Sequence, residues 1–304
     1  MIHVIGNAAI DTILHIDRFP RPGETIVARA LREDLGGKGA NQAIVIARCG
    51  VPVRLAAALG DDAAGARIRQ SLEAEDVVTD SLAAFGGASD RCLIMVDAAG
   101  ENMIVSLIDA ARAFDPAADI RLVESIAPGD WVLMQGNLGS AVTRACLALA
   151  RRRGAATALN ASPTYPAAEY DWSLVNLVVV NRGEAVELGG HEDPVASARA
   201  LREMGAGGVA LTIGEQGVVL VTADGDVRSE APAVAAVDTV GAGDVFCGAL
   251  IAARAAGRTW SGSLRIAVEA AAIAVTRRGV LAAFPTRAEM AGLFSRWAVE
   301  EPRT

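Results

Sequence analysis

The stretch VDTVGAGDVFCGAL, residues 237–250, decides the fold because it joins a glycine-rich step to an apolar helical pattern. Gly241 and Gly243 tolerate positive φ angles and let a ligand approach the backbone closely. A helix that begins here presents unpaired N–H groups and a partial positive charge, which together suit a phosphate. Asp244 stands at this helix start, either as a cap or as a base for an attacking hydroxyl. The stretch therefore indicates an anion site beside a carboxylate.

Composition limits the class of protein. The 304 residues are 52% hydrophobic, which is enough for one large α/β domain or two smaller ones. Four scattered cysteines without a CxxC pair predict a reduced, cytoplasmic protein. No signal-peptide pattern, long apolar run or histidine cluster is visible, so we expect no export, membrane span or zinc site. The net charge of -8 argues against nucleic acid as a main partner.

Short apolar runs alternate with helical patterns along the chain. Because the runs are continuously apolar, they predict strands of a parallel sheet that is covered on both faces. The alternation favours an open, doubly wound α/β sheet with right-handed crossovers. The expected strands are residues 2–8, 53–59, 131–136, 156–162, 177–181 and 209–214, and the expected helices are residues 62–75, 140–153, 194–205, 242–256, 261–277 and 286–299.

Two segments break this alternation. Residues 12–32 and 91–107 both read as strand–turn–strand units, with proline or glycine at the turns. They predict either a small side sheet or ordinary edge hairpins. Because we find no repeat or linker, we expect one domain over residues 1–304, with an excursion formed by about 12–33 and 89–108.

Three further motifs carry candidate chemistry. The segment LGGKGANQA, residues 35–43, holds the only lysine and is neither a P-loop nor a GxGxxG fingerprint. It predicts a tight turn, or exposed backbone that binds sugar hydroxyls together with Asn41. Asp11 ends the first expected strand, where open α/β sheets bind ligands, and is either a hydroxyl acceptor or a solvated turn residue. Asn181 and Glu184 indicate a helix cap or a water-mediated Mg²⁺ site.

These segments, in this order, resemble the ribokinase-like (PfkB) family of carbohydrate kinases, and the overall pattern is closest to the ribokinases. GGKGAN looks like the family's N-terminal signature, DTVGAGDVF matches its C-terminal signature D-T-x-G-A-G-D-x-F, and NRGE fits its N-x-x-E motif. AVTRRG and LTIGEQG look like segments from the nucleotide and cation sides of ribokinases. The resemblance runs nearly from end to end of the chain.

The resemblance implies a three-layer α/β/α fold with a mainly parallel sheet, a small β-sheet lid and the ATP-dependent phosphorylation of a primary hydroxyl on a small sugar, such as a ribose-like pentose. It makes Asp244 the catalytic base beside an anion hole. The implied site residues are Gly241, Ala242 and Gly243 for the anion hole; Asp11, Gly36, Gly37, Lys38, Asn41 and Asn137 for the sugar; Asn181, Thr212, Gly214 and Gly217 for ATP; Glu184 for Mg²⁺ through water; and Asp238, Val240, Ala274 and Gly279 for K⁺.

The chain departs from the ribokinases mainly on the sugar side. Ala9 replaces an asparagine, and the spacing of Asn7 from Asp11 is more like that of adenosine kinases. Asn137 stands where ribokinases tend to have a glutamate, and Ala111-Arg112 replaces part of a G-A-N motif. Ala283 replaces a serine near the cation loop, which makes the need for K⁺ less secure.

The specificity therefore stays open. A nucleoside kinase similar to adenosine kinases is one alternative, and a sugar-phosphate kinase that uses Arg91 is another, although Arg91 also fits a solvent-facing strand arginine. A non-catalytic sugar or nucleotide sensor is a third alternative, which the complete GAGD step disfavours. Apolar faces on residues 91–96 and 103–108 are compatible with a homodimer through the lid.

Overall fold

The computed structural model describes residues 1–98 and 101–298. Its main sheet has the strand order β13-β12-β11-β10-β9-β8-β1-β4-β5. Only the β11–β12 and β12–β13 pairs are antiparallel in this sheet, so the predicted mainly parallel sheet is confirmed. The strands are β1 (Ile2–Ile5), β4 (Val53–Gly60), β5 (Val78–Phe85), β8 (Trp131–Gln135), β9 (Ala156–Asn160), β10 (Leu177–Asn181), β11 (Val209–Thr212), β12 (Val218–Thr222) and β13 (Gly225–Ser229).

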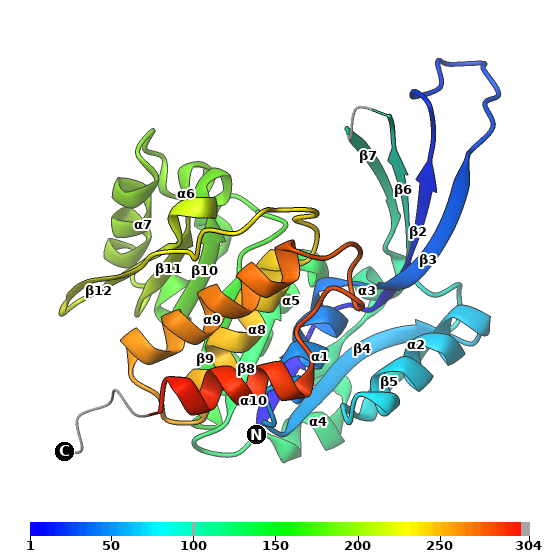
Figure 1. The fold of residues 1–304 in the computed structure, drawn as a ribbon. Helices are drawn as coiled ribbons and strands as arrows, with labels where there is room; N and C mark the ends of the chain where they lie inside the picture. Colours follow the sequence, from blue (N-terminus) through cyan, green and yellow to red (C-terminus); the bar gives the residue numbers. More distant parts are fainter. Residues whose placement is uncertain (99–100, 299–304) are drawn as a thin grey trace.

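Helices cover both faces of this sheet and form three layers (Figure 1). Strand β10 shows why, since Leu177 and Val179 enter one buried cluster while Val178 and Val180 enter the other. One layer contains α1 (Lys38–Arg48), α2 (Ala63–Ala74), α8 (Ala242–Ala255), α9 (Trp260–Val275) and α10 (Arg287–Arg296). The other contains α3 (Asp109–Ala113), α4 (Ile120–Ser125), α5 (Ser140–Arg152), α6 (Arg182–Gly189) and α7 (Pro194–Glu203).

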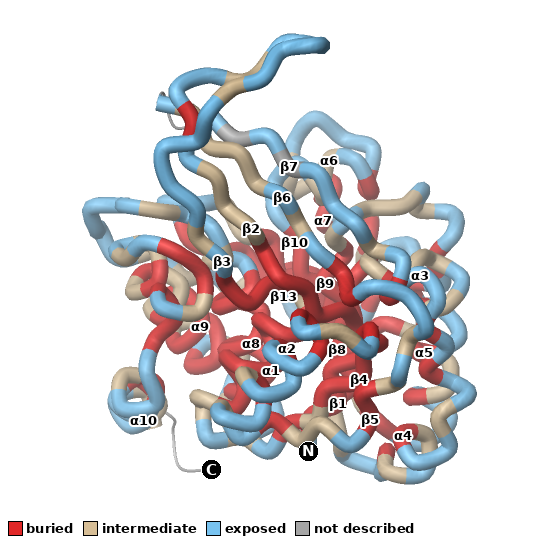
Figure 2. Tube along the Cα trace, turned by 90° about the vertical axis from the view of Figure 1, so that its right-hand side faces the viewer, coloured by how far each residue is buried: buried red, intermediate tan, exposed pale blue. Residues whose placement is uncertain are grey.

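A second sheet stands off the main body, as Figures 1 and 2 show. Its strand order is β3-β2-β6-β7, with β2 (Ala9–His15), β3 (Ala30–Gly36), β6 (Arg91–Val96) and β7 (Asn102–Leu107). The prediction of a small separate sheet is thus confirmed over that of edge hairpins. Asp11 pairs in register with Asp34 and Cys92, so strand alternation puts these three side chains on one face of the small sheet.

Several predicted boundaries differ from the structure. The expected first strand, residues 2–8, is divided, because β1 ends at Ile5 and the chain then leaves the main sheet to pair with β3. Strands β5, β12 and β13 were not among the expected strands; β5 reads VTDSLAAF, so its first half is mostly polar and the strand is not a continuous apolar run. The expected end of the last helix at 299 and part of the expected turn at 99–100 lie outside the described residues.

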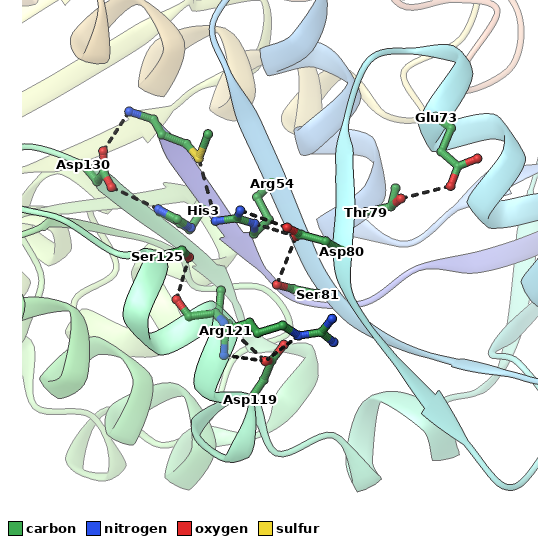
Figure 3. A network of polar contacts seen from close by, with 12 residues as sticks. His3, Arg54, Glu73, Thr79, Asp80, Ser81, Asp119, Arg121, Ser125 and Asp130 are labelled. Carbon is green, nitrogen blue, oxygen red and sulfur yellow. Dashed lines mark hydrogen bonds and ion pairs between the residues drawn. The ribbon is translucent and has the colours of Figure 1, made fainter.

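The amino-terminal ends of the strands are fastened by paired charges, shown in Figure 3. The Met1 ammonium donates to Asp130 at 2.8 Å, and Nε2 of His3 lies 3.1 Å from the other Asp130 oxygen. Burial lowers the pKa of His3, although Asp130 opposes this effect. Arg54 on β4 pairs with Asp80 on β5 at 2.7 Å. Within residues 1–98 and 101–298, no helix has the length and apolar character needed to cross a bilayer.

Candidate active site

The start of α8 is built from glycine. Gly241 is its N-cap at φ +78°, and a side-chain carbon there would lie 2.8 Å from the Phe284 ring, so glycine is required for both reasons. No side chain caps this helix, whereas Asn181 caps α6 and Thr286 caps α10. The N–H of Ala242 donates to Thr239 at 3.3 Å. An uncapped helix start beside open space at Gly243 is suited to an anion.

Asp244 is the third residue of α8, so it is not the N-cap of this helix. Its carboxylate is only 6% exposed and accepts hydrogen bonds from two side chains of α1. Nδ2 of Asn41 donates to Oδ2 at 2.9 Å, and Nε2 of Gln42 donates to Oδ1 at 2.9 Å. Two neutral amides therefore fix both oxygens of a buried carboxylate.

Sequence reasoning missed the amides behind this carboxylate. Gln42 also donates to Asn160 at 3.0 Å and accepts from Gln135 at 2.7 Å. The signal was present, because Gln42 interrupts an apolar helix while Gln135 and Asn160 end apolar strands. A buried polar side chain in such a position needs a partner, and here the partners are one another and Asp244.

Asp11 lies on β2, on the same face of the small sheet as Asp34 and Cys92. A side-chain carbon at Gly36 would lie 2.1 Å from Oδ1 of Asp11, so glycine gives this carboxylate its room. Burial raises the pKa of Asp11 to about 6, and the negative charges of Asp34 and Asp244 add to the rise, while a hydrogen bond from Cys92 opposes it. Asp11 and Asp244 thus lie close enough for their charges to interact.

Three acceptor atoms of the predicted sugar-side residues lack partners. Oδ1 of Asp11, Oδ1 of Asn41 and Oδ1 of Asn137 are buried and have no hydrogen bond. Leaving such an acceptor unpaired costs about 1–3 kcal/mol. The atoms come from β2, α1 and the turn after β8, and the hydroxyl donors of a ligand are the kind of group that pairs with such acceptors.

The predicted nucleotide-side residues meet at the ends of β10 and β11. Asn181 pairs in register with Thr212, and Gly214 begins the short 3₁₀ turn (Gly214–Gln216) that leads to Gly217. Asn181 and Glu184 form a capping box, with bonds of 3.0 and 2.8 Å. Of the two interpretations of this pair, a helix cap and a water-mediated Mg²⁺ site, the structure contains the helix cap.

The residues fit a magnesium ion only in part. Oε2 of Glu184 already accepts the Asn181 N–H, which leaves one carboxylate oxygen to face water. Among residues 1–98 and 101–298, no group of three His, Cys, Asp or Glu side chains could hold a metal. Magnesium keeps much of its water shell and is commonly held by substrate phosphates, so a single carboxylate acting through water is compatible with it.

Asp238 connects the segment before α8 to the loop after α9. Its Oδ1 accepts the Val240 N–H at 3.0 Å and its Oδ2 accepts the Gly279 N–H at 3.1 Å. A carboxylate beside backbone carbonyls is a donor set suited to a hard cation. The Ala274 carbonyl fits less well, because the N–H groups of Thr276 and Arg277 already donate to it. Ala283 is buried in the same loop.

The remaining predicted site residues lie on different elements. Gly37 is the N-cap of α1, and Lys38 is the first, half-buried residue of that helix. Arg91 pairs in register with Ile10, so it lies on the face of the small sheet opposite Asp11. It is 3.8 Å from Glu33 and half-exposed, which matches the interpretation as a strand arginine.

Two clefts flank the edge strand β5, away from these residues. One has a volume of about 210 Å³ and is lined by Phe85, Phe114 and Asp119 among others. The other, of about 450 Å³, includes Asp62. Asp62 and Asp119 both cap helices, so their carboxylates are already occupied, and neither cleft matches the convergence of unpaired acceptors near Asp244.

Comparisons with known sequences give a family match. A sequence model described as the pfkB family carbohydrate kinase matches residues 1–287. The chain is 31% identical to a ribokinase of Bacillus subtilis over 294 residues, which cover 97% of this chain and 99% of that protein. It is 29% identical to a ribokinase of Haemophilus influenzae, with 94% of this chain and 95% of that protein covered.

Solved structures give the same result. A ribokinase from Thermotoga maritima superposes with a TM-score of 0.87 at 26% identity, covering 97% of this chain and 99% of that one. An Arabidopsis thaliana ribokinase, complexed with ribose and ATP, superposes with a TM-score of 0.86 at 25% identity, covering 96% of this chain and 97% of that one. The expected three-layer fold with its small sheet is thus confirmed.

Proposed function

Since this chain belongs to the pfkB family of carbohydrate kinases, we propose that it is a ribokinase-type enzyme that transfers the γ-phosphoryl group of ATP to the primary hydroxyl of ribose or a related pentose. The relatives of matching length include ribokinases and deoxyribokinases, and one solved relative holds ribose and ATP. Transfer uses a single domain, residues 1–304, with the small sheet and its connections (about 12–33 and 89–108) as a lid.

One observation carries this proposal: Asp11, Asn41 and Asn137, the residues assigned to the sugar, keep buried acceptor atoms without partners, and Asn41 also donates to the Asp244 carboxylate. A pentose offers several hydroxyl donors and no charge, so it can pair with these acceptors without bringing a counter-charge. A phosphorylated sugar would put an anion near Asp11 and Asp244, which Coulomb repulsion opposes. Arg91 points to the opposite face and cannot offset this repulsion.

The chemistry follows from the positions of the groups. Vicinal hydroxyls of the sugar donate to Asp11, and its primary hydroxyl donates to Asp244, which accepts the proton as the O–P bond forms. The bond from the γ-phosphorus to the bridging oxygen breaks, and ADP leaves. The amides of Gly241, Ala242 and Gly243 at the start of α8 stabilise the charge on the group in transit. Asn41 and Gln42 hold the carboxylate in the orientation that this step needs.

ATP binds across the ends of β10 and β11. Asn181, Thr212, Gly214 and Gly217 line this side, and Glu184 would hold Mg²⁺ through water. Mg²⁺ neutralises the charge of the phosphates when bound. Asp238, Val240 and Gly279 would hold K⁺, with a smaller part for Ala274. Lys38 and the backbone of Gly36 and Gly37 border the sugar.

The outward face of the small sheet forms a homodimer contact in the same proposal. Leu31, Val105 and Met103 on this face are 64%, 59% and 47% exposed. Three large apolar side chains on one sheet face are typical of a surface that another chain covers. Light scattering that finds only monomers at micromolar concentration would remove this part of the proposal.

An ADP-release assay across pentoses, hexoses, sugar phosphates and nucleosides, with Na⁺ or K⁺, tests the proposed activity. We expect the highest kcat/KM with ribose or a close pentose, and a rise in rate on replacing Na⁺ by K⁺. A preference for purine nucleosides would replace the sugar in this proposal by a nucleoside. ADP release that no acceptor stimulates would contradict it.

A further inference from the structure

The small sheet touches the loop that follows α9. Asp34, on β3, is only 9% exposed, and its Oδ2 accepts both Nη2 of Arg32 at 2.6 Å and the N–H of Val280 at 3.3 Å. The connection from α9 to α10 passes beside the base of the small sheet (Figure 1). One carboxylate thus joins the small sheet to the main body.

Arg32 also packs onto the residue before Val280. Gly279 has φ +93°, and a side-chain carbon built there would lie 2.1 Å from Nη2 of Arg32. The guanidinium therefore occupies the space that any other residue at position 279 would need. The Asp34 carboxylate fixes this guanidinium by a hydrogen bond. The loop at Gly279 therefore keeps its contacts with both Arg32 and Asp34 in only one arrangement.

The same two loop residues lead to the start of α8. The N–H of Gly279 donates to Asp238, and the other oxygen of Asp238 accepts the N–H of Val240, next to Gly241. A continuous set of contacts therefore runs from Arg32 and Asp34 through Gly279 to the glycine step. At the far end of the loop, Arg48 donates to the carbonyls of Leu281, Phe284 and Pro285, so that end is fixed independently.

We infer that Arg32 and Asp34 are positioning residues that couple the small sheet to the start of α8, so that the sheet's position determines the order of the predicted anion hole. Neither residue touches the reacting atoms. The effect on catalysis rests on the proposed kinase function, whereas the effect on the loop does not. Loss of the contact should loosen residues 237–243 and 276–284 together, although they are far apart in sequence.

A matched variant is available on the same strand. Arg67, on α2, donates to Glu33 of β3 at 2.7 Å and so also ties the small sheet to the body, but away from the loop. The experiment measures amide hydrogen exchange, kcat and the KM for ATP in Arg32→Ala, Arg67→Ala and the unaltered protein. Asp34→Asn, which keeps the side-chain volume, is the second test variant if Arg32→Ala folds poorly.

For Arg32→Ala we expect exchange in residues 237–243 and 276–284 to be faster by about tenfold, as the loss of a charged hydrogen bond predicts. We expect kcat to fall by about tenfold, with the KM for ATP changed less than about twofold, because the ATP side lies on other strands. Arg67→Ala should leave both segments near their normal exchange rates.

Unchanged exchange in both segments, or equal acceleration by Arg32→Ala and Arg67→Ala, would overturn the inference. A fall in kcat without faster exchange would overturn it as well. If the exchange results are as expected but the unaltered protein phosphorylates no sugar, the coupling stands and the proposed function fails.

Discussion

The buried polar groups at the two ends of the parallel strands differ in whether they have hydrogen-bond partners. At the amino ends, Asp130 pairs with the Met1 ammonium and with His3. At the carboxyl ends, acceptor atoms of Asp11, Asn41 and Asn137 have no partner. The Nδ1 atom of His3 also lacks a partner, but the ring is fully buried and closed to a ligand. The amino ends are therefore built for stability, and the carboxyl ends keep polar groups free for a substrate.

This contrast predicts that substitutions at the carboxyl ends alter catalysis more than stability. Asp244→Asn is the strongest case. It keeps the shape but removes the base, so kcat should fall by about 10²–10⁴-fold, while the free energy of unfolding changes by only about 1 kcal/mol. ADP release gives kcat, calorimetry should find ATP binding intact, and urea unfolding gives the stability. Turnover near the normal rate would show that Asp244 is not the base.

Asp11→Asn should separate binding from stability. The sugar KM should rise by about 10- to 100-fold, because an ionised acceptor for two hydroxyls is lost. The folded pKa of Asp11, about 6, lies above its usual 3.8, so its contribution to stability is full below 3.8 and is lost as pH rises through 6.

The variant should therefore be more stable than the unaltered protein at pH 8, by about 1–2 kcal/mol, and show no gain at pH 4. Urea unfolding at both pH values checks this. Equal stability at pH 8 would mean that the Asp11 carboxylate is not held in an unfavourable environment.

Many of the site residues at the carboxyl ends of the strands could be predicted from the sequence. Asp11, Asn41 and Asp244 sit in short motifs whose order along the chain is informative. The pattern of Asn181 and Glu184 allowed a helix cap, and the structure contains that capping box at the start of α6. The resemblance of these motifs to a known family gave the fold and the reaction class.

The rest depended on distant parts of the chain. Gln42, Gln135 and Asn160 meet only because α1, β8 and β9 are neighbours in the folded protein, and no local pattern reveals this. The direction of Arg91 depended on the register between β2 and β6, since a shift of one residue would turn it toward Asp11. In these cases the pairing of distant elements, and not the residue types, determines where the side chains lie.

At the amino ends, substitutions should alter stability and leave catalysis unchanged. Asp130→Ala removes the partner of both the Met1 ammonium and the buried His3. We expect the free energy of unfolding to fall by about 2–3 kcal/mol, because a buried polar group loses its hydrogen bond. Urea unfolding measures this loss. A change of more than about twofold in kcat/KM at a temperature where the variant is folded would contradict the contrast between the two ends.

Arg54→Ala gives the smallest expected effect. Its partner Asp80 is 51% exposed, so solvent screens the ion pair. We expect a loss of about 0–1 kcal/mol in the free energy of unfolding, and less in high salt. Thermal unfolding at low and high salt measures it. A loss as large as that of Asp130→Ala would show that the pair does more than join β4 to the edge strand β5.

The most direct test of the central claim combines binding and turnover in one pair of proteins. The unaltered enzyme and Asp244→Asn are each mixed with ribose, ATP and Mg²⁺, and ³¹P NMR follows the phosphate esters while calorimetry follows ribose binding. The account predicts a new sugar phosphate and ADP with the unaltered enzyme, and ribose binding without product with Asp244→Asn. Equal product from both proteins, or no pentose binding by either, would contradict it.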